Sequence, residues 1–204
     1  LAPFIDFNLD GSYTPKDGDY PAIKGDKAVY CIFNDINDEH TASFGAGLGI
    51  EVQMLAYTYS ESDAIYLEYY IINRRPRIYS DVKIGFFLDG ECGLRTDNYA
   101  GTLEQYPQTI FVHNGDEEDE GFFMNDLPFV GVVFLNENLA QSISFTDGSG
   151  KNGKPQVNTD FIRYSQGMWR DSTPLTFGKS GTETGDKTPY IFAQSSLNND
   201  DSNN

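Results

Sequence analysis

The sequence predicts an all-β protein, an antiparallel β-sandwich of jelly-roll-like form with long acidic loops and at most one or two short helices. Short segments alternate apolar and polar residues, and Gly, Pro and Asp separate these segments. Tyr and Phe, which favour strands, supply most of the aromatic residues. The chain has 204 residues, which suits a single β-rich domain.

Composition predicts three parts along the chain. Residues 1–27 are rich in Gly, Pro and Asp, and we expect them to form a segment of turns and loops, packed on the domain. Residues 28–194 carry the strand-like segments and form the expected sandwich domain. Residues 195–204 are polar and of low complexity, which is typical of a tail or linker.

The clearest expected strand covers residues 50–59, where Val52, Met54 and Ala56 fall on one face. Further strands are expected at 28–33, 65–73, 81–88, 109–113, 129–135, 142–146 and 191–193. One short helix is expected, capped by residues 158–160 and running to Trp169. Its inner face would carry Phe161, Tyr164, Met168 and Trp169.

The most distinctive motif lies at residues 6–17. Oxygen-bearing side chains stand at loop positions 1, 3, 5 and 12, and Gly11 stands at position 6, which is the spacing of an EF-hand calcium loop. Pro3, Pro15 and Pro21 rule out flanking helices, so we expect a free-standing Ca²⁺ loop. The predicted ligands are Asp6, Asn8, Asp10, Ser12, Asp17 and Asp19. The alternative is a solvated turn of Asp, Asn and Gly.

Two other acidic stretches are candidate cation sites or solvated loops. One is residues 114–121, and the other pairs residues 89–90 with residues 97–98. His40 and His113 are the only histidines, and no Cys-x-x-Cys or Gly-x-Ser-x-Gly motif is present. We therefore do not expect a zinc site, and we expect both histidines at the surface or at strand ends. A Ser/His/Asp triad without a nucleophile elbow stays open as an alternative.

The two cysteines leave alternatives open. Cys31 and Cys92 either form one disulfide or are separately buried as small apolar residues. The net charge of −17 and the lack of a basic patch exclude nucleic acid as an expected partner. No apolar run reaches transmembrane length, so direct membrane insertion is not expected. Because the chain begins at Leu1 rather than Met, we expect a processed or excised segment.

Eleven stretches spread over nearly the whole chain occur in a characteristic order: residues 6–10, 18–26, 30–34, 40–41, 50–51, 70–74, 87–90, 97–101, 114–121, 128–132 and 167–178. In this order they resemble a module of large secreted surface proteins of the Bacteroidetes. Such proteins typically leave the cell through the type IX secretion system. The resemblance implies an extracellular or cell-surface location, a multidomain parent chain with neighbouring domains as partners, and no established catalytic residues.

The sequence favours a non-catalytic, calcium-stabilised module that acts in adhesion or in a surface assembly, with surface glycans or other surface proteins as possible partners. One alternative is a carbohydrate-binding module, in which exposed Tyr, Phe or Trp169 stacks on sugars, although Trp169 fits a core position better. The other is a glycan-acting hydrolase, which needs two carboxylates across a cleft. Glu68 is the best single candidate for such an acid, but most acidic residues lie in Asp/Asn/Gly loops, so we do not expect an enzyme.

Overall fold

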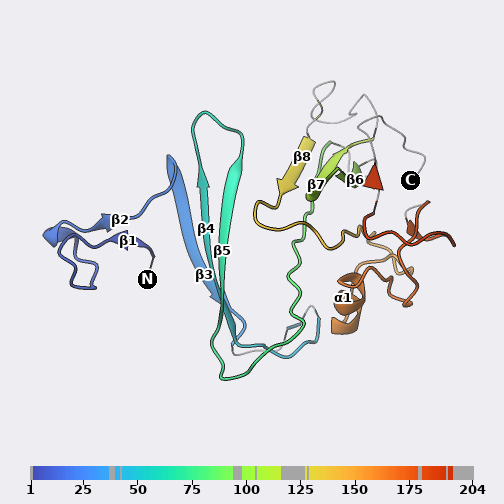
Figure 1. Cartoon of the computed structure of the whole chain (residues 1–204), viewed down its shortest axis with the longest axis horizontal. Coiled ribbons are helices and arrows are strands. Elements are labelled where there is room, and N and C mark those ends of the chain that lie inside the picture. Colours follow the sequence, from blue (N-terminus) through green and yellow to red (C-terminus); the bar gives the residue numbers. More distant parts are fainter. Residues whose placement is uncertain are drawn as a thin grey trace. The chain divides into compact units, whose positions relative to one another are not determined.

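The computed structural model describes residues 2–36, 40–41, 43–93, 98–103, 105–115, 127, 129–178, 181–191 and 193–194. These residues form mostly strands, arranged in three sheets, and one short helix (Figure 1). This confirms the all-β prediction. The chain divides into an N-terminal unit, Leu1–Thr41 with Gly45–Ser80, and a C-terminal unit, Ala42–Phe44 with Asp81–Asn204.

The N-terminal unit is built on a three-stranded antiparallel sheet in the order β3-β4-β5. Its strands are β3 (Lys27–Asn34), β4 (Ile50–Thr58) and β5 (Ile65–Asn73). The strands expected at 28–33, 50–59 and 65–73 are thereby confirmed. Apolar alternation predicted these strands correctly. Each segment pairs with a neighbouring strand in a hydrogen-bonded ladder, so its backbone groups are satisfied.

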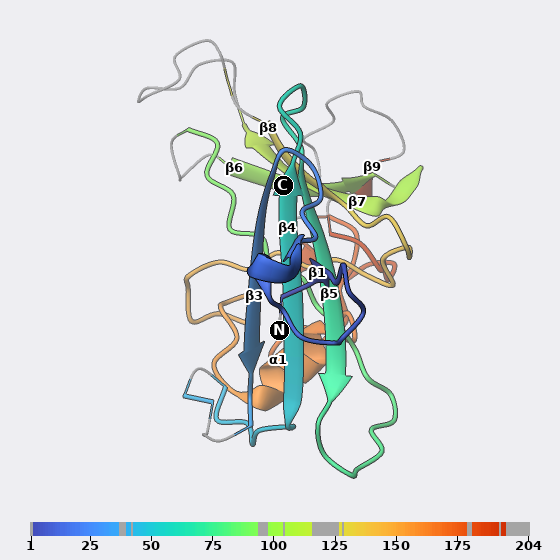
Figure 2. The same ribbon diagram turned by 90° about the vertical axis from the view of Figure 1, so that its left-hand side faces the viewer.

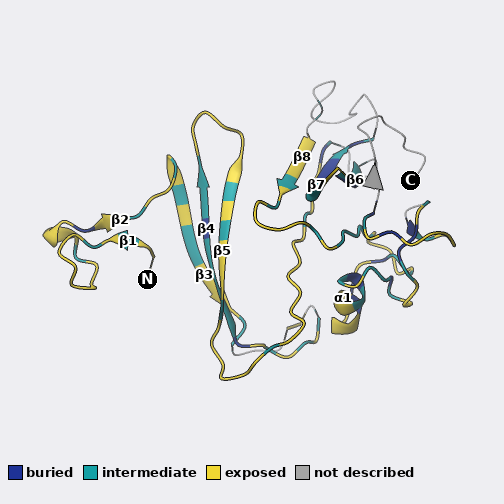
Figure 3. Ribbon diagram, viewed as in Figure 1, coloured by how far each residue is buried: buried dark blue, intermediate teal, exposed yellow. Residues whose placement is uncertain are grey.

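The two faces of this sheet differ in character. The register places Tyr30 opposite Leu55, and Leu55 opposite Glu68, on one face. The other face carries exposed apolar side chains, among them Phe33 and Ile71, which flank Val52 on the central strand. Figure 3 shows exposed and intermediate residues alternating along β3 and β5.

A short antiparallel pair, β1 (Phe4–Ile5) and β2 (Tyr20–Pro21), begins the chain. The loop between them includes a 3-10 turn at Pro15–Asp17. The first 27 residues are thus mostly turn and loop, as predicted, but they also contain this strand pair. In Figure 2 the pair and its loop lie in front of the β3-β4-β5 sheet. We call residues 2–24 the N-terminal arm.

The C-terminal unit contains a four-stranded sheet in the order β8-β7-β6-β9. Its strands are β6 (Asn98–Leu103), β7 (Tyr106–Asn114), β8 (Phe129–Val133) and β9 (Ala193–Gln194), and β9 runs parallel to β6. The strands expected at 109–113 and 129–135 are confirmed, and the one expected at 191–193 begins later. Sequence reasoning missed β6, whose Ala, Gly and Thr residues give weak strand alternation.

Two expected strands do not form. Residues 81–88 pair with no strand, although their apolar residues alternate. Aromatic contacts hold this segment instead, because Phe86 meets Phe134 edge-on and Phe87 stacks on Phe145. Residues 142–146 form only isolated bridges at their two ends. Alternation indicates a possible strand face, but a strand also needs a partner for its backbone hydrogen bonds.

The helix α1 (Asn158–Tyr164) is confirmed but is shorter than predicted. It ends before Trp169, and Phe161 is 45% exposed rather than on an inner face. Val157 is the N-cap residue and makes no side-chain cap. Asp160 instead accepts a hydrogen bond from the Gln156 backbone N–H, so its buried carboxylate points toward the residues that precede the helix.

A compact apolar cluster lies beside this helix. Its members are Tyr164, Trp169, Leu175 and Ile191, and we call them the tryptophan core. Trp169 is fully buried, at 0% exposure, and its indole N–H donates to the carbonyl of Gly181 at 2.6 Å. The core interpretation of Trp169 is therefore confirmed.

Both cysteines are free, so the disulfide alternative is not realised. Cys92 is fully buried, and its thiol donates to the Val112 carbonyl. Burial raises the pKa of the Cys92 thiol, which keeps it protonated. Among the residues that the structure describes, no helix has the length and apolarity needed to cross a membrane.

Candidate binding site of the N-terminal unit

The loop between β1 and β2, residues 6–19, is organised by carboxylates, and we call it the carboxylate loop. The Asp6 carboxylate accepts the backbone N–H groups of Asp10 at 3.2 Å and of Gly11 at 2.7 Å. Gly11 has φ of +79°, a conformation that favours glycine. The expected tight turn at loop position 6 is therefore present, wrapped around the first predicted ligand.

The next polar side chains continue the same turn. The Asp10 carboxylate accepts the Ser12 backbone N–H at 2.7 Å and the Asn8 side-chain amide at 3.0 Å. Asn8 Oδ1 accepts the Asp10 N–H at 3.2 Å. The structure thus brings Asp6, Asn8, Asp10 and Ser12 into one turn.

Asp19 closes the base of the carboxylate loop. Its side chain is buried, at 5% exposure. One carboxylate oxygen accepts the Phe7 N–H at 2.9 Å and the other accepts the Thr14 N–H at 2.7 Å. Asp17 lies in the 3-10 turn between Thr14 and Asp19. A single carboxylate therefore holds the loop at Phe7 and at Thr14.

The donor set of the carboxylate loop suits a hard cation such as Ca²⁺, which binds carboxylate, amide and carbonyl oxygens. In the described part of the chain, no three Asp, Glu, His or Cys side chains converge closely enough to hold a metal. A calcium ion in this turn would therefore use Asp6 and Asp10 together with Asn8, Ser12, backbone carbonyls and water. The oxygen chemistry fits, with a ligand set that is weaker in charge than a full EF-hand.

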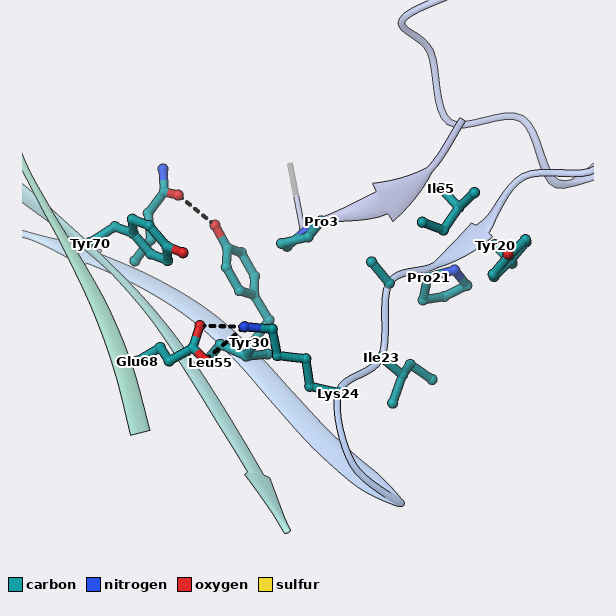
Figure 4. Close-up of a pocket in the computed structure, with 12 residues that line it drawn as sticks. Pro3, Ile5, Tyr20, Pro21, Ile23, Lys24, Tyr30, Leu55, Glu68 and Tyr70 are labelled. Carbon is teal, nitrogen blue, oxygen red and sulfur yellow. Dashed lines mark hydrogen bonds and ion pairs between the residues drawn. The ribbon is translucent and has the colours of Figure 1, made fainter. Parts of the chain in front are cut away.

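A groove of about 740 Å³ lies between the N-terminal arm and the sheet (Figure 4). We call it the tyrosine groove, because Tyr20 comes from β2, Tyr30 from β3 and Tyr70 from β5. Tyr20 and Tyr70 are 55% and 59% exposed. Its remaining lining residues are Pro3, Ile5, Pro21, Ala22, Ile23, Lys24, Gln53, Leu55 and Glu68.

An ion pair bridges the groove from the arm to the sheet. Lys24 Nζ donates to both oxygens of the Glu68 carboxylate at 2.7 Å, and the Tyr57 hydroxyl donates to the same carboxylate at 3.2 Å. The Lys24 hydrogen bond lowers the pKa of Glu68, although partial desolvation opposes it, and the same bond raises the pKa of Lys24. Both groups are therefore charged at neutral pH.

A second polar contact lies on the sheet wall of the groove. The Tyr30 hydroxyl donates to Gln53 Oε1 at 2.9 Å, and Gln53 in turn donates to Glu51 at 2.8 Å. Arg74 then holds Glu51 at 2.7 Å. This chain fixes the Tyr30 ring and leaves a largely apolar groove with a few oriented polar groups, which is typical of ligand sites.

The other predicted cation sites are only partly described. Residues 116–121 of the acidic stretch and Asp97 lie outside the described residues. His40 lies 3.7 Å from Asp35, and His113 stacks on Tyr99 and contacts Phe111 with its ring tilted. Both histidines are thus accounted for by local packing and pairing.

Sequence reasoning did not identify the groove. The expected strand at 65–73 is present as β5, whose alternation places Glu68 and Tyr70 on one face. Nothing in the sequence indicated that Tyr20 and Lys24 would face them from the N-terminal arm. Comparisons with protein-family models, with curated proteins and with solved structures found no match to this chain.

Proposed function

We propose that this chain is a non-catalytic, calcium-stabilised module of a secreted or cell-surface protein, acting in adhesion or in a surface assembly. The observation that carries the proposal is the carboxylate loop, in which Asp6, Asn8, Asp10 and Ser12 share one turn and Asp19 closes the base. The loop joins β1 to β2, and both strands line the groove. A calcium ion there would fix one wall of a binding surface.

The location and partners of the module also belong to this proposal. The resemblance to secreted Bacteroidetes surface proteins supports an extracellular setting, type IX export and neighbouring domains in a longer chain. Extracellular calcium modules bind Ca²⁺ with dissociation constants of about 10⁻⁴–10⁻³ M. A carboxylate loop that relies partly on amide, hydroxyl and backbone oxygens suits that range of affinity.

The state of Glu68 supports a non-catalytic role. A glycosidase acid needs a raised pKa, so that it carries a proton at working pH. The bond from Lys24 lowers the pKa of Glu68 instead. Glu68 therefore suits a binding contact better than a proton donor.

The finer fold, a jelly-roll-like antiparallel β-sandwich, is also part of the proposal. It is supported by the apolar face of the β3-β4-β5 sheet, which carries exposed Val29, Phe33, Leu67 and Ile71. Such a face is stable only when a second layer covers it. If a second layer covers this face, the native protein should enhance the fluorescence of a hydrophobic dye such as ANS only slightly. Strong enhancement of ANS fluorescence by the native protein would contradict the sandwich.

Calcium dependence of thermal unfolding tests the main proposal. At a dissociation constant of about 10⁻⁴–10⁻³ M, Ca²⁺ at about 10 mM is about ten to one hundred times that constant and adds about 1.4–2.7 kcal/mol to the free energy of unfolding. We therefore expect millimolar Ca²⁺ to raise the melting temperature of the chelated protein, and Asp6→Asn and Asp10→Asn to remove most of that rise. Equal concentrations of Mg²⁺ should act weakly, because Mg²⁺ demands a near-octahedral shell.

Asp63→Asn is the matched control, because Asp63 is an exposed carboxylate in the turn between β4 and β5. It should retain the full calcium response. If Ca²⁺ leaves the melting temperature of the wild-type protein unchanged relative to excess EDTA, calcium stabilisation is wrong.

A further inference from the structure

Exposed tyrosines line the tyrosine groove from both the arm and the sheet. Tyr20 belongs to the N-terminal arm and Tyr70 to the sheet, and more than half of each residue is exposed. Pro21 and Leu55 add apolar surface between them (Figure 4). A tyrosine offers an apolar ring and a polar hydroxyl, which suits ligands that are apolar on one face and polar at the rim.

The charges of the groove cancel. Lys24 and Glu68 are the charged residues in its lining, and they pair with each other at 2.7 Å. The whole chain carries a net charge of −17, which repels polyanions at long range. The groove therefore favours a ligand without net charge.

The paired ions still offer hydrogen bonds to a ligand. The Lys24 side chain is 51% exposed and that of Glu68 is 30% exposed. An ammonium donates and a carboxylate accepts, so together they match neighbouring hydroxyl groups, each of which can do both. A proline-rich peptide also docks on aromatic grooves, but its proline residues provide only carbonyl acceptors, which could bond to Lys24 but not to Glu68.

We propose that the tyrosine groove binds a neutral oligosaccharide, with the rings of Tyr20 and Tyr70 stacked on sugar faces and the Lys24–Glu68 pair bonded to sugar hydroxyls. This inference rests on the proposed non-catalytic module and names the class of ligand it would hold. The groove volume of about 740 Å³ falls within the range of small-ligand sites.

Binding to an immobilised array of neutral oligosaccharides, built from glucose, mannose, galactose, xylose and N-acetylglucosamine, tests the inference. The array also carries heparin, alginate and a proline-rich peptide. The strongest neutral ligand is then titrated by calorimetry. We expect Tyr20→Ala and Tyr70→Ala each to weaken binding about tenfold or more, as truncation of an aromatic anchor does.

Tyr69→Ala is the matched control, because Tyr69 neighbours Tyr70 on β5, faces the other side of the sheet and is 44% exposed. It should bind like the wild-type protein. Tyr70→Phe retains the ring and should retain most of the affinity. If Tyr70→Ala does not fold, Tyr20→Ala and Tyr70→Phe still decide the result, since Tyr20 lies on a two-residue strand of the arm.

Several outcomes would overturn the inference: no neutral oligosaccharide bound, binding unchanged in Tyr20→Ala and Tyr70→Ala, or preference for an anionic glycan or the proline-rich peptide. Each assay is run with Ca²⁺ and with EDTA. A calcium-dependent melting temperature without glycan binding would overturn the groove inference but leave the calcium module standing. Release of new reducing ends from a bound glycan would instead overturn the non-catalytic proposal while leaving the groove occupied.

Discussion

The carboxylate loop and the tryptophan core both hold long stretches of irregular backbone, but they do so by different means. Residues 6–19 wrap around Asp6 and Asp19, whose oxygens accept backbone N–H groups, while Phe7 and Leu9 remain exposed. The loops that follow α1 converge instead on Trp169, packed with Tyr164, Leu175 and Ile191. One region uses local polar bonds and the other uses burial of apolar surface.

The buried carboxylates of the two regions sharpen this contrast. Asp160, beside the tryptophan core, lies 3.4 Å from both Arg163 and Arg170. Burial works to raise its pKa, but backbone hydrogen bonds and the two arginines outweigh burial and lower it. Asp19 is held by backbone N–H dipoles instead. The comparison teaches that Asp160 has arginine counter-ions within the C-terminal unit, whereas Asp19 in the N-terminal loop relies on backbone N–H groups.

The largest expected effect is the loss of the tryptophan core. Trp169→Ala should lower the free energy of unfolding by about 3–5 kcal/mol, because it removes a fully buried ring and leaves a cavity. Native-state hydrogen exchange should show lost protection at the amides of Trp169 and Leu175 and little change in β4. Phe161→Ala, at an exposed position on α1, should have a much smaller effect. Equal loss of protection in β4 would show that the two regions are not held separately.

A smaller effect is expected from Asp19→Asn. One oxygen of the carboxylate is replaced by an NH₂ group, which then faces a backbone N–H of Phe7 or Thr14 and leaves it without an acceptor. An unsatisfied buried donor costs about 1–3 kcal/mol. Hydrogen exchange at Phe7 and Thr14 should accelerate, while exchange in the tryptophan core stays unchanged. Asp17→Asn, at an exposed position, is the control, and an equally large effect there would argue against Asp19 as the anchor of the loop.

The smallest effect should come from the ion pair of the groove, because both of its side chains are partly exposed. The pKa of Glu68 is lowered, so the pair stabilises the fold above the unfolded pKa of this carboxyl and loses that contribution as pH falls through the folded pKa. The pKa of Lys24 is raised, so the pair is also lost as pH rises through the folded pKa of Lys24, which lies above the usual value of a lysine. Melting temperatures of wild-type protein and Glu68→Gln should therefore differ most near neutral pH and converge in acid. A difference that persists unchanged at low pH would exclude this pair as its cause.

The sequence by itself determined the features that depend on neighbours along the chain. The alternation of 50–59 and 65–73 predicted β4 and β5, because side chains of a strand point to opposite faces in turn. The Asp, Asn and Gly spacing of 6–17 predicted the turn around Asp6, because its hydrogen bonds span only a few residues. Whether calcium occupies that turn stays a prediction.

The tertiary structure alone decided which residues meet and which are covered. Residues 81–88 alternate as well as β5 does, yet they lack a pairing strand and form none. Trp169 and Phe161 were predicted on one helix face, but packing buries the first and exposes the second. The tyrosine groove joins Tyr20 and Lys24 to Tyr30, Glu68 and Tyr70. Contacts between residues so distant along the chain depend on how the arm folds over the sheet, and no local pattern encodes that path.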